Sequence, residues 1–392
     1  MQKKLIALAV AGLASTGAFA QANVTVYGVA DATFDVVKVG GDAAQELGNT
    51  TRVSTNSSYV GFKGAEALGN GLTAVFQFES GVGFDNTGSL GATRDSFVGV
   101  SSGFGTVVMG NLTGPTRALG GAVDVNSGST GIGSNGGLIG KLGNNLVNMT
   151  NTSGSYTPNG ACDRSSTCVS IFDNRWKNAV AYVSPSFAGL SATVAYVANE
   201  NKNFRGAAAA NTTGFDAGLK YANGPIMAAV TYNAVSLGNF VANTAGSTDV
   251  SNFRIGGSYD FGVASIRALF DRTRADHVSG TMNTVTQNVF GLGGTFNVTP
   301  AGKIIGQAYF ARDLKANGSS QDDTGAKLFE VGYEHSLSKR TILKAVYAHL
   351  NNDKQAGYDF GINAVGINPT AGGLNTAGAT LQGIQLGLRH SF

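Results

Sequence analysis

The 392-residue chain is poor in charged residues, proline, cysteine and histidine. Charged residues make up 13% of it and the formal net charge is +3, which leaves no basic surface for nucleic acid. The four histidines lack the spacing of metal ligands, so we expect no metal and no cofactor. No motif marks a nucleophile with histidine and acidic partners, so the sequence does not indicate an enzyme.

Long apolar runs are missing after the first 20 residues. The chain starts with a cationic stretch (residues 1–4), an apolar run (5–14) and then Ala18-Phe-Ala20, the order of a secretory signal peptide. The apolar run is too short to span a bilayer as a helix, which takes about 20 residues. We therefore expect a signal peptide at residues 1–20 and a mature chain at residues 21–392.

Alternation of apolar and polar residues dominates the rest of the chain, in which 57 glycines accompany 42% apolar residues. Period-two alternation is typical of a strand with one oily and one wet face. It is clearest at the end, where one face carries Ile384, Leu386, Leu388 and Phe392 and the other carries Gln385, Gly387, Arg389 and Ser391. Similar stripes occur at residues 24–36, 72–78, 190–196, 215–221, 253–261, 264–270 and 329–333.

Short and long connections alternate between these segments. Turn-rich short connections lie at residues 64–71, 101–105, 184–189, 222–225, 260–262, 299–302 and 337–339. Longer polar connections lie near residues 38–52, 80–93, 111–174, 198–213, 234–251, 272–284, 312–326 and 351–379. These fifteen connections join sixteen strands, the even number of a bacterial outer-membrane barrel. The sequence thus predicts an all-β fold, a transmembrane 16-stranded antiparallel β-barrel with long extracellular loops and short periplasmic turns.

A soluble, secreted β-sandwich or solenoid is the alternative, because its sheets also have one wet face. The polar faces here include charges that no dry core could hold unpaired, namely Asp31, Glu79, Lys177, Arg267, Glu330 and Lys344. A water-filled lumen accommodates them, and about sixteen strands leave room for such a channel. The charges therefore favour the barrel.

Several segments resemble the Gram-negative general porin family, in its beta-proteobacterial branch. The resemblance is carried by residues 24–31 (VTVYGVAD), 61–72 (GFKGAEALGNGL), 97–110 (FVGVSSGFGTVVMG), 182–189 (YVSPSFAG), 332–341 (GYEHSLSKRT) and 387–392 (GLRHSF). It implies a homotrimer of sixteen-stranded barrels in the Gram-negative outer membrane, through which ions and small hydrophilic solutes diffuse. It also implies contact with outer-membrane lipid and lipopolysaccharide, and an assembly machinery that recognises the strand ending in Phe392.

The third long loop, residues 111–174, is the longest connection, and loops of this length are usually functional or disordered. The resemblance implies that it folds into the lumen and narrows it. Its acids would then face bases on the wall and create a transverse field. Candidate acids are Asp124, Asp163 and Asp173, and candidate bases are Arg94, Arg175 and Lys177. Alternation places Arg175 and Lys177 on one face, opposite Trp176 and Tyr182. Each charge is equally open to interpretation as a solvated group at a loop–strand junction.

Ion selectivity is left open by the residues near these charges. Anion-preferring relatives often carry arginine where this chain has Tyr59, and some show a second base where Asp95 follows Arg94. The resemblance therefore implies weak selectivity of either sign. A substrate-selective channel for a sugar or an anion, and a barrel acting mainly as an adhesin, remain alternatives.

Cys162 and Cys168 lie close together in a polar segment of a chain that we expect to be exported. Disulfides form in such compartments, so a local Cys162–Cys168 bridge is predicted. It would pin only the end of the third loop.

Overall fold

A large sheet of nineteen hydrogen-bonded strands and a separate two-stranded hairpin make up the computed structural model. The structure describes residues 24–41, 47–84, 91, 93–142, 149–152, 155–158, 172–198, 213–236, 249–276, 284–365 and 377–392. The hairpin pairs β7 (Met149–Thr152) with β8 (Ser155–Pro158), and the helical elements are α2 (Pro115–Val123) and the 3-10 turn η1 (Asn135–Gly137). Within these ranges no helix is long and apolar enough to cross a membrane.

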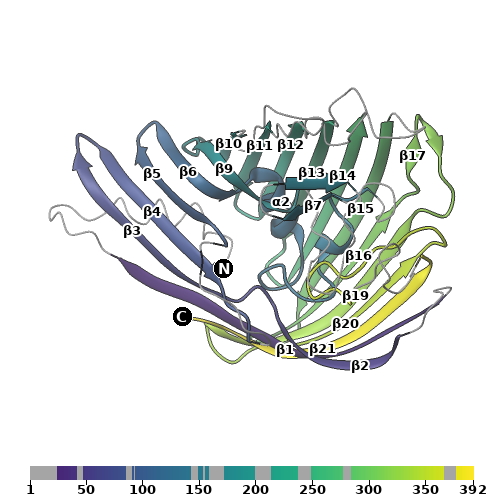
Figure 1. The fold of residues 1–392 in the computed structure, drawn as a ribbon. Helices are drawn as coiled ribbons and strands as arrows, with labels where there is room; N and C mark the ends of the chain where they lie inside the picture. The colour runs from purple at the N-terminus through teal and green to yellow at the C-terminus, as the bar shows by residue number, and fades with distance from the viewer. Residues whose placement is uncertain are drawn as a thin grey trace.

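The large sheet closes on itself. Its strands are β1 (Thr25–Gly41), β2 (Leu47–Thr55), β3 (Tyr59–Gly69), β4 (Leu72–Gly81), β5 (Ser96–Ser102), β6 (Gly105–Thr113), β9 (Arg175–Val183), β10 (Leu190–Val197), β11 (Thr213–Asn223), β12 (Ile226–Ser236), β13 (Asp249–Asp260), β14 (Ala264–Asp276), β15 (Thr284–Asn297), β16 (Gly302–Ala311), β17 (Lys315–Ala316), β18 (Ser319–Ser320), β19 (Ala326–Ser336), β20 (Thr341–Asn352) and β21 (Ala379–Ser391). All pairings are antiparallel, and β21 pairs with β1 from Gly41↔Ala379 to Val29↔Ser391. Figure 1 shows β1 in purple beside β21 in yellow.

Seventeen of these segments form the sixteen strands of the wall that the sequence predicts. β2 and β3 pair with successive halves of β1 and act as one strand interrupted at residues 56–58, where Ser57 has a positive φ of 55°. β17 and β18 form a small hairpin in the loop between β16 and β19. The seven short turns join strands where expected, although β3 continues to Gly69, so the first turn is narrower than predicted.

The two faces of the wall differ as the alternation predicts. On β1, Asp31, Thr33 and Asp35 are buried toward the interior, whereas Phe34 is exposed on the outside and Ala32 and Val36 are partly exposed there. Exposed aromatic rings form bands near both ends of the strands. They include Phe290, which packs against the partly exposed Phe270 with centroids 5.1 Å apart, and Tyr259 against Phe261 at 4.6 Å. Such bands are the aromatic girdles of membrane barrels.

The buried core lies inside the barrel and is built largely by connections. Leu119 and Val123 of α2, with Leu138 and Ile139 after η1, pack against inward side chains of the wall such as Leu328. In Figure 1, α2 is enclosed by the curve of the sheet. The third connection therefore contacts the inner faces of distant strands, and its side chains define the interior.

Candidate functional site: the barrel interior at the third loop

The described part of the third loop begins with α2. Pro115 occupies the first helical turn, where its missing N–H costs nothing, and Asp124 ends the helix in an extended conformation. Two glycines allow the close approach of this helix to the wall. A side chain at Gly114 would collide with the Asp216 carboxylate, and one at Gly120 would lie 2.7 Å from Arg254 Nη1. Local sequence thus sets the helix, and glycine sets how closely it packs.

Asp216 on β11 fixes the beginning of α2. The Thr116 hydroxyl donates to Asp216 Oδ1 at 2.6 Å, and Trp176 Nε1 donates to Asp216 Oδ2 at 3.1 Å. Thr116 lies just after β6 and Trp176 lies on β9, so the carboxylate joins the two ends of the third loop. All three residues are buried.

Arg254 on β13 is a second anchor and is fully buried. Its guanidinium donates to Asp173 at 2.8 Å, to Asp271 at 2.7 Å and to the carbonyl of Thr116 at 2.8 Å. A buried charge of this kind is stable only when it is paired and hydrogen-bonded. Arg254 therefore holds both ends of the third loop against one strand.

The middle of the loop reaches the opposite part of the wall through a pair of carboxylates. Asn126 Nδ2 donates to Asp124 Oδ1 at 3.0 Å and to Glu330 Oε2 on β19 at 2.9 Å. Gln307 Nε2 on β16 donates to Glu330 at 2.7 Å and to the carbonyl of Gly133 at 2.8 Å. Burial raises the pKa of Asp124, and hydrogen bonds from its neighbours oppose that shift.

The loop also contacts the strands where the sheet closes. Thr130 Oγ1 donates to Asp31 on β1 at 3.3 Å, and Asp31 is itself paired with Lys344 at 2.6 Å and Arg389 at 3.0 Å. Asp31 is fully buried, and these two cations supply the pairing that a buried carboxylate requires. Contacts with β1, β11, β13, β16 and β19 thus carry the loop across the interior.

Three arginines, Arg94, Arg117 and Arg175, form a cluster inside the barrel near the two ends of the third loop. Arg94 Nε lies 3.3 Å from Glu79 Oε2, and Arg175 Nε lies 3.2 Å from Asp95 Oδ1. Arg117 comes from α2. Burial and, second, the nearby positive charge of Arg175 lower the pKa of Arg117 to about 10. The pKa of Arg94 is lowered by the same two causes, burial first. An arginine stays protonated in proteins, so three positive charges lie beside Glu79 and Asp95 here, and Asp173, which is paired with Arg254, also acts on Arg117.

Tyr59 lies beneath this cluster. The Arg94 guanidinium stacks over the Tyr59 ring at 4.4 Å from its centroid, a cation–π contact. The Tyr27 hydroxyl donates to Glu79 at 2.8 Å and so orients the carboxylate that pairs with Arg94. Tyr59 therefore positions Arg94 and contributes no positive charge of its own.

The predicted site residues fall into separate groups. Arg94, Arg175 and Tyr59 come together in the arginine cluster, which Arg117 completes. Asp124 is held within the loop by the Asn135 N–H, and its carboxylate does not face the cluster, which corrects the expected arrangement. Asp173 is paired with Arg254, and its negative charge also acts on Arg117. Asp163, Cys162 and Cys168 lie outside the described residues, as does the expected signal peptide at residues 1–20.

The prediction that Trp176 and Tyr182 share a face is wrong. The pairing of β6 with β9 shifts between Gly110 and Leu112, and Asn178 has a positive φ of 53°. This β-bulge interrupts the alternation. Trp176 consequently points inward with Ala179, whereas Tyr182 is exposed on the outside.

The last connection, residues 353–365, also packs inside the barrel, which the sequence does not indicate. Tyr358 and Phe360 are buried in the same core as α2. A side chain at Gly361 would collide with the backbone of Gly136 and Gly137. The third and the last connection are therefore in contact through these glycines. Arg52 on β2 donates to the carbonyls of Asn363 and Ala364 and holds this segment.

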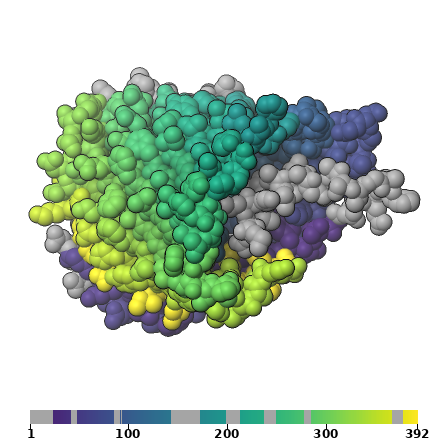
Figure 2. Space-filling view, turned by 180° about the vertical axis from the view of Figure 1, so that it is seen from behind, coloured from purple at the N-terminus to yellow at the C-terminus, as the bar shows by residue number. Residues whose placement is uncertain are grey.

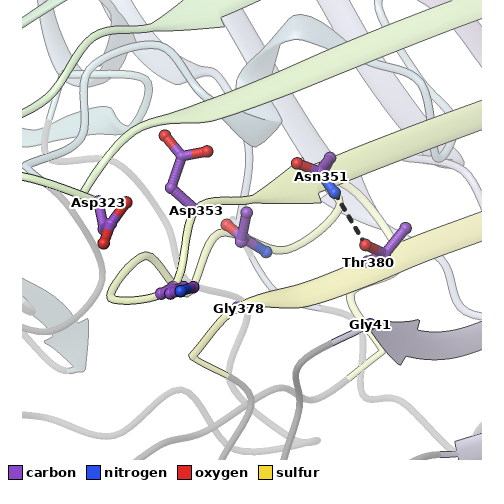
Figure 3. Close-up of a pocket in the computed structure, with 8 residues that line it drawn as sticks. Gly41, Asp323, Asn351, Asp353, Gly378 and Thr380 are labelled. Carbon is purple, nitrogen blue, oxygen red and sulfur yellow. Dashed lines mark hydrogen bonds between the residues drawn. The ribbon is translucent and has the colours of Figure 1, made fainter.

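A separate polar pocket of about 400 Å³ opens at the loop end of the barrel. Its lining includes Gly41, Asp323, Asn351, Asp353, Gly378 and Thr380 (Figure 3). Asn351 Nδ2 donates to Thr380 Oγ1 at 2.9 Å and ties β20 to β21 beside it. Within the described ranges no group of histidine, cysteine and acidic side chains could hold a metal ion.

A closed sixteen-stranded antiparallel barrel, oily outside and charged inside, defines a membrane channel of the porin class. Comparison with known proteins gives the particular family. The model of the family described as Gram-negative porin matches residues 7–355. The chain belongs to the Gram-negative porin family and is an outer-membrane porin.

Its relatives are porins of beta-proteobacteria. The chain is 32% identical to outer membrane porin protein 32 of Delftia acidovorans, over the whole length of both chains. It is 28% identical to major outer membrane protein P.IB of Neisseria lactamica, with 91% of this chain and 96% of that one covered.

Solved structures show the same fold. The anion-selective porin from Comamonas acidovorans superposes with a TM-score of 0.72 at 26% identity, covering 95% of this chain and all of the other. OmpT of Vibrio cholerae in its trimer form gives a TM-score of 0.63 at 15% identity, covering 95% and 99%, a likeness of fold alone.

Proposed function

We propose that this porin passes small hydrophilic solutes and ions by diffusion with a modest preference for anions. The observation that carries the proposal is Arg117, which the third loop adds to Arg94 and Arg175. Three guanidinium groups there face the carboxylates of Glu79 and Asp95, and the third nearby acid, Asp173, is paired with Arg254, so the local potential is positive. The solved relative from Comamonas acidovorans is described as anion-selective, which supports the same sign.

We further propose that the third loop narrows the channel and that the protein assembles as a homotrimer. The anchors at Asp216, Arg254 and Glu330 support an inward loop, and OmpT of Vibrio cholerae supports the trimer. Lipopolysaccharide and the barrel assembly machinery are the partners that the family resemblance implies.

Reversal potentials in a potassium chloride gradient test the selectivity. Wild-type channels in planar bilayers should show a reversal potential of the sign that indicates chloride selectivity. Arg117→Gln should move this reversal potential toward zero. The exposed pair of the last turn, Lys339→Gln with Arg340→Gln, is the control and should change little. A reversal potential of the sign that indicates cation selectivity in the wild type contradicts the proposal. Saturable block by one sugar or anion would favour a substrate-selective channel, and absence of conductance would favour an adhesin.

A further inference from the structure

Arg389 of β21 lies on the inner face of the barrel, at the junction of the first and last strands. It pairs in register with Asp31 of β1, and Tyr59 of β3 pairs with Val29 on the other side of β1. Two interstrand spacings, roughly 10 Å, therefore separate the strand of Arg389 from that of Tyr59. Purple and yellow atoms adjoin at the lower edge of Figure 2, where these two ends of the sheet meet.

One edge of the Arg389 guanidinium has free donors. Nη1 donates to Asp31 Oδ2 at 3.0 Å, whereas Nε and Nη2 have no hydrogen-bond partner within the part of the chain that the structure describes. Neither of these two nitrogens is closed off from solvent, and the side chain is partly exposed toward the interior. The N–H groups of Nε and Nη2 point in parallel, so this edge matches the two oxygens of a carboxylate.

Asp31 does not neutralise Arg389, because the same carboxylate has a second cation. Lys344 Nζ lies 2.6 Å from Asp31 Oδ1, and the Lys344 side chain is buried. Asn56 and Thr130 also donate hydrogen bonds to this carboxylate. One acid thus faces two cations, and the group keeps a net positive charge beside the free edge of Arg389.

The third loop holds the guanidinium in place without using its donors. A side chain on Gly128 would lie 2.7 Å from Cζ, Nη1 and Nη2 of Arg389 alike, so this glycine packs against the flat face of the guanidinium. Gly128 has a positive φ of 79°, which glycine adopts without strain. The face is therefore covered by the loop, and the Nε and Nη2 edge stays free.

Arg389 lies next to the arginine cluster along the wall. Arg94 of the cluster stacks on Tyr59 and is paired with Glu79. The positive charges of Arg94 and Arg389 both act on the Tyr59 hydroxyl. Arg389 thus adds a base beside the cluster, from the last strand of the barrel.

Arg52 of β2 is an interior arginine of the opposite kind. Its Nε donates to Asp35 Oδ2 at 3.2 Å, and its Nη1 and Nη2 donate to the carbonyls of Ala364 and Asn363. All three nitrogens are used, so Arg52 has the same charge as Arg389 and no free edge. It offers a matched comparison.

We propose that the free edge of Arg389 binds small carboxylates in transit through two parallel hydrogen bonds, and that the channel therefore favours them over spherical anions such as chloride. Arginine suits this role because its planar fork binds two oxygens at once, whereas lysine offers only a point charge. The proposal rests on the anion preference proposed above and adds the shape of the preferred anion.

Bi-ionic reversal potentials test this role of Arg389. Potassium formate on one side of a planar bilayer and potassium chloride on the other give the formate-to-chloride permeability ratio. In the wild type this ratio should exceed the ratio of the aqueous mobilities at least two-fold. Arg389→Lys keeps the charge and removes the fork, so its ratio should fall to that of the mobilities while chloride selectivity stays unchanged. Arg52→Lys is the matched control and should keep the wild-type ratio.

An unchanged formate ratio in Arg389→Lys overturns the proposal, as does an equal loss in Arg52→Lys. If Arg389→Lys does not fold, the wild-type conductance decides. It should saturate with rising formate concentration but not with chloride, and a proportional rise with formate overturns the proposal. Cation selectivity of the wild type in potassium chloride would refute the anion preference proposed above. An anion-selective channel whose formate ratio does not depend on Arg389 would refute the further inference alone.

Discussion

Asn126 of the third loop donates hydrogen bonds from a single amide nitrogen to Asp124 and to Glu330, at 3.0 and 2.9 Å. One carboxylate belongs to the loop and the other to β19 on the wall. Both are buried, so the amide bridges two groups that would otherwise repel each other. The position of the loop therefore depends on a neutral side chain placed between two acids.

Replacing Asn126 should loosen the loop without unfolding the barrel. A hydrogen bond to a charged group contributes about 1.5–3 kcal/mol. Asn126→Leu should therefore speed amide hydrogen exchange of residues 126–135 by about ten-fold or more, since each 1.4 kcal/mol is roughly a factor of ten. Asn223→Leu, on an exposed turn, is the control and should leave this exchange unchanged. Equal protection in the wild type and Asn126→Leu would rule out the bridging role.

Arg254→Met should cost stability, because it leaves Asp173 and Asp271 without their shared cation. Breaking a buried ion pair by removing one partner costs about 3–5 kcal/mol. Urea unfolding of the folded barrel measures the loss. Arg274→Met, which breaks the exposed pair with Asp276, should cost about 1 kcal/mol or less. Adding Asp271→Asn to Arg254→Met should recover part of the loss, and a double variant less stable than Arg254→Met would contradict this account.

Phe392 should be needed for barrel assembly. Its N–H donates to the carbonyl of Gly28 at 3.1 Å and its carbonyl accepts from the Gly28 N–H at 3.1 Å, which fastens the end of β21 to β1. Its ring lies 2.5 Å from where a side chain on Gly28 would begin. Deletion of Phe392 should reduce folded barrel in the outer membrane while export continues, and Gly28→Val should act similarly. Heat-modifiable mobility of membrane fractions measures both, with Gly103→Ala at the open turn between β5 and β6 as the control. Normal folding of both variants would disprove this closure role.

Alkaline pH should weaken anion preference through Lys141. Burial lowers the pKa of this loop ammonium to about 8, below the value near 10.4 for a free lysine. Lys141 is thus charged at pH 7 and loses its charge as the pH rises through 8, which removes one positive charge from the interior. Because the folded pKa is depressed, stability should also rise with pH between about 8 and 10.

Reversal potentials at pH 7 and pH 9 check the effect of Lys141. At pH 9 the reversal potential of wild-type channels should shift toward cation selectivity. The shift should be smaller for Lys141→Arg, because arginine keeps its charge. Identical shifts in the two proteins would show that another group titrates.

The strands and turns could be predicted because they depend on local chemistry. Alternation on residues such as Asp31, Phe34 and Leu386 is fixed by the two faces of a strand, and turn residues mark the ends. The face of Trp176 could not be predicted, because a bulge at Asn178 changes the count by one residue. The residue types near Asn178 do not indicate this bulge.

The site was harder to predict because its contacts join distant parts of the chain. Arg94 and Arg175 were recognisable as bases beside the third loop, but Arg117 enters the cluster only through the placement of α2. That placement depends on Asp216 and Arg254, which lie on strands far along the sequence. Asp124 looked like a pore acid, whereas its actual partners are set by the same packing.

The junction of β1 with β21 has a consequence for the timing of folding. Thirteen residue pairs join these strands across a sequence separation of more than 300 residues. Until that junction forms, the sheet has two free edges, whose unpaired backbone groups are costly in hydrocarbon. Such non-local pairing is slow. A nascent chain that has not yet made β21 therefore cannot enter the bilayer as a stable intermediate, and it must be kept soluble until its two ends can meet.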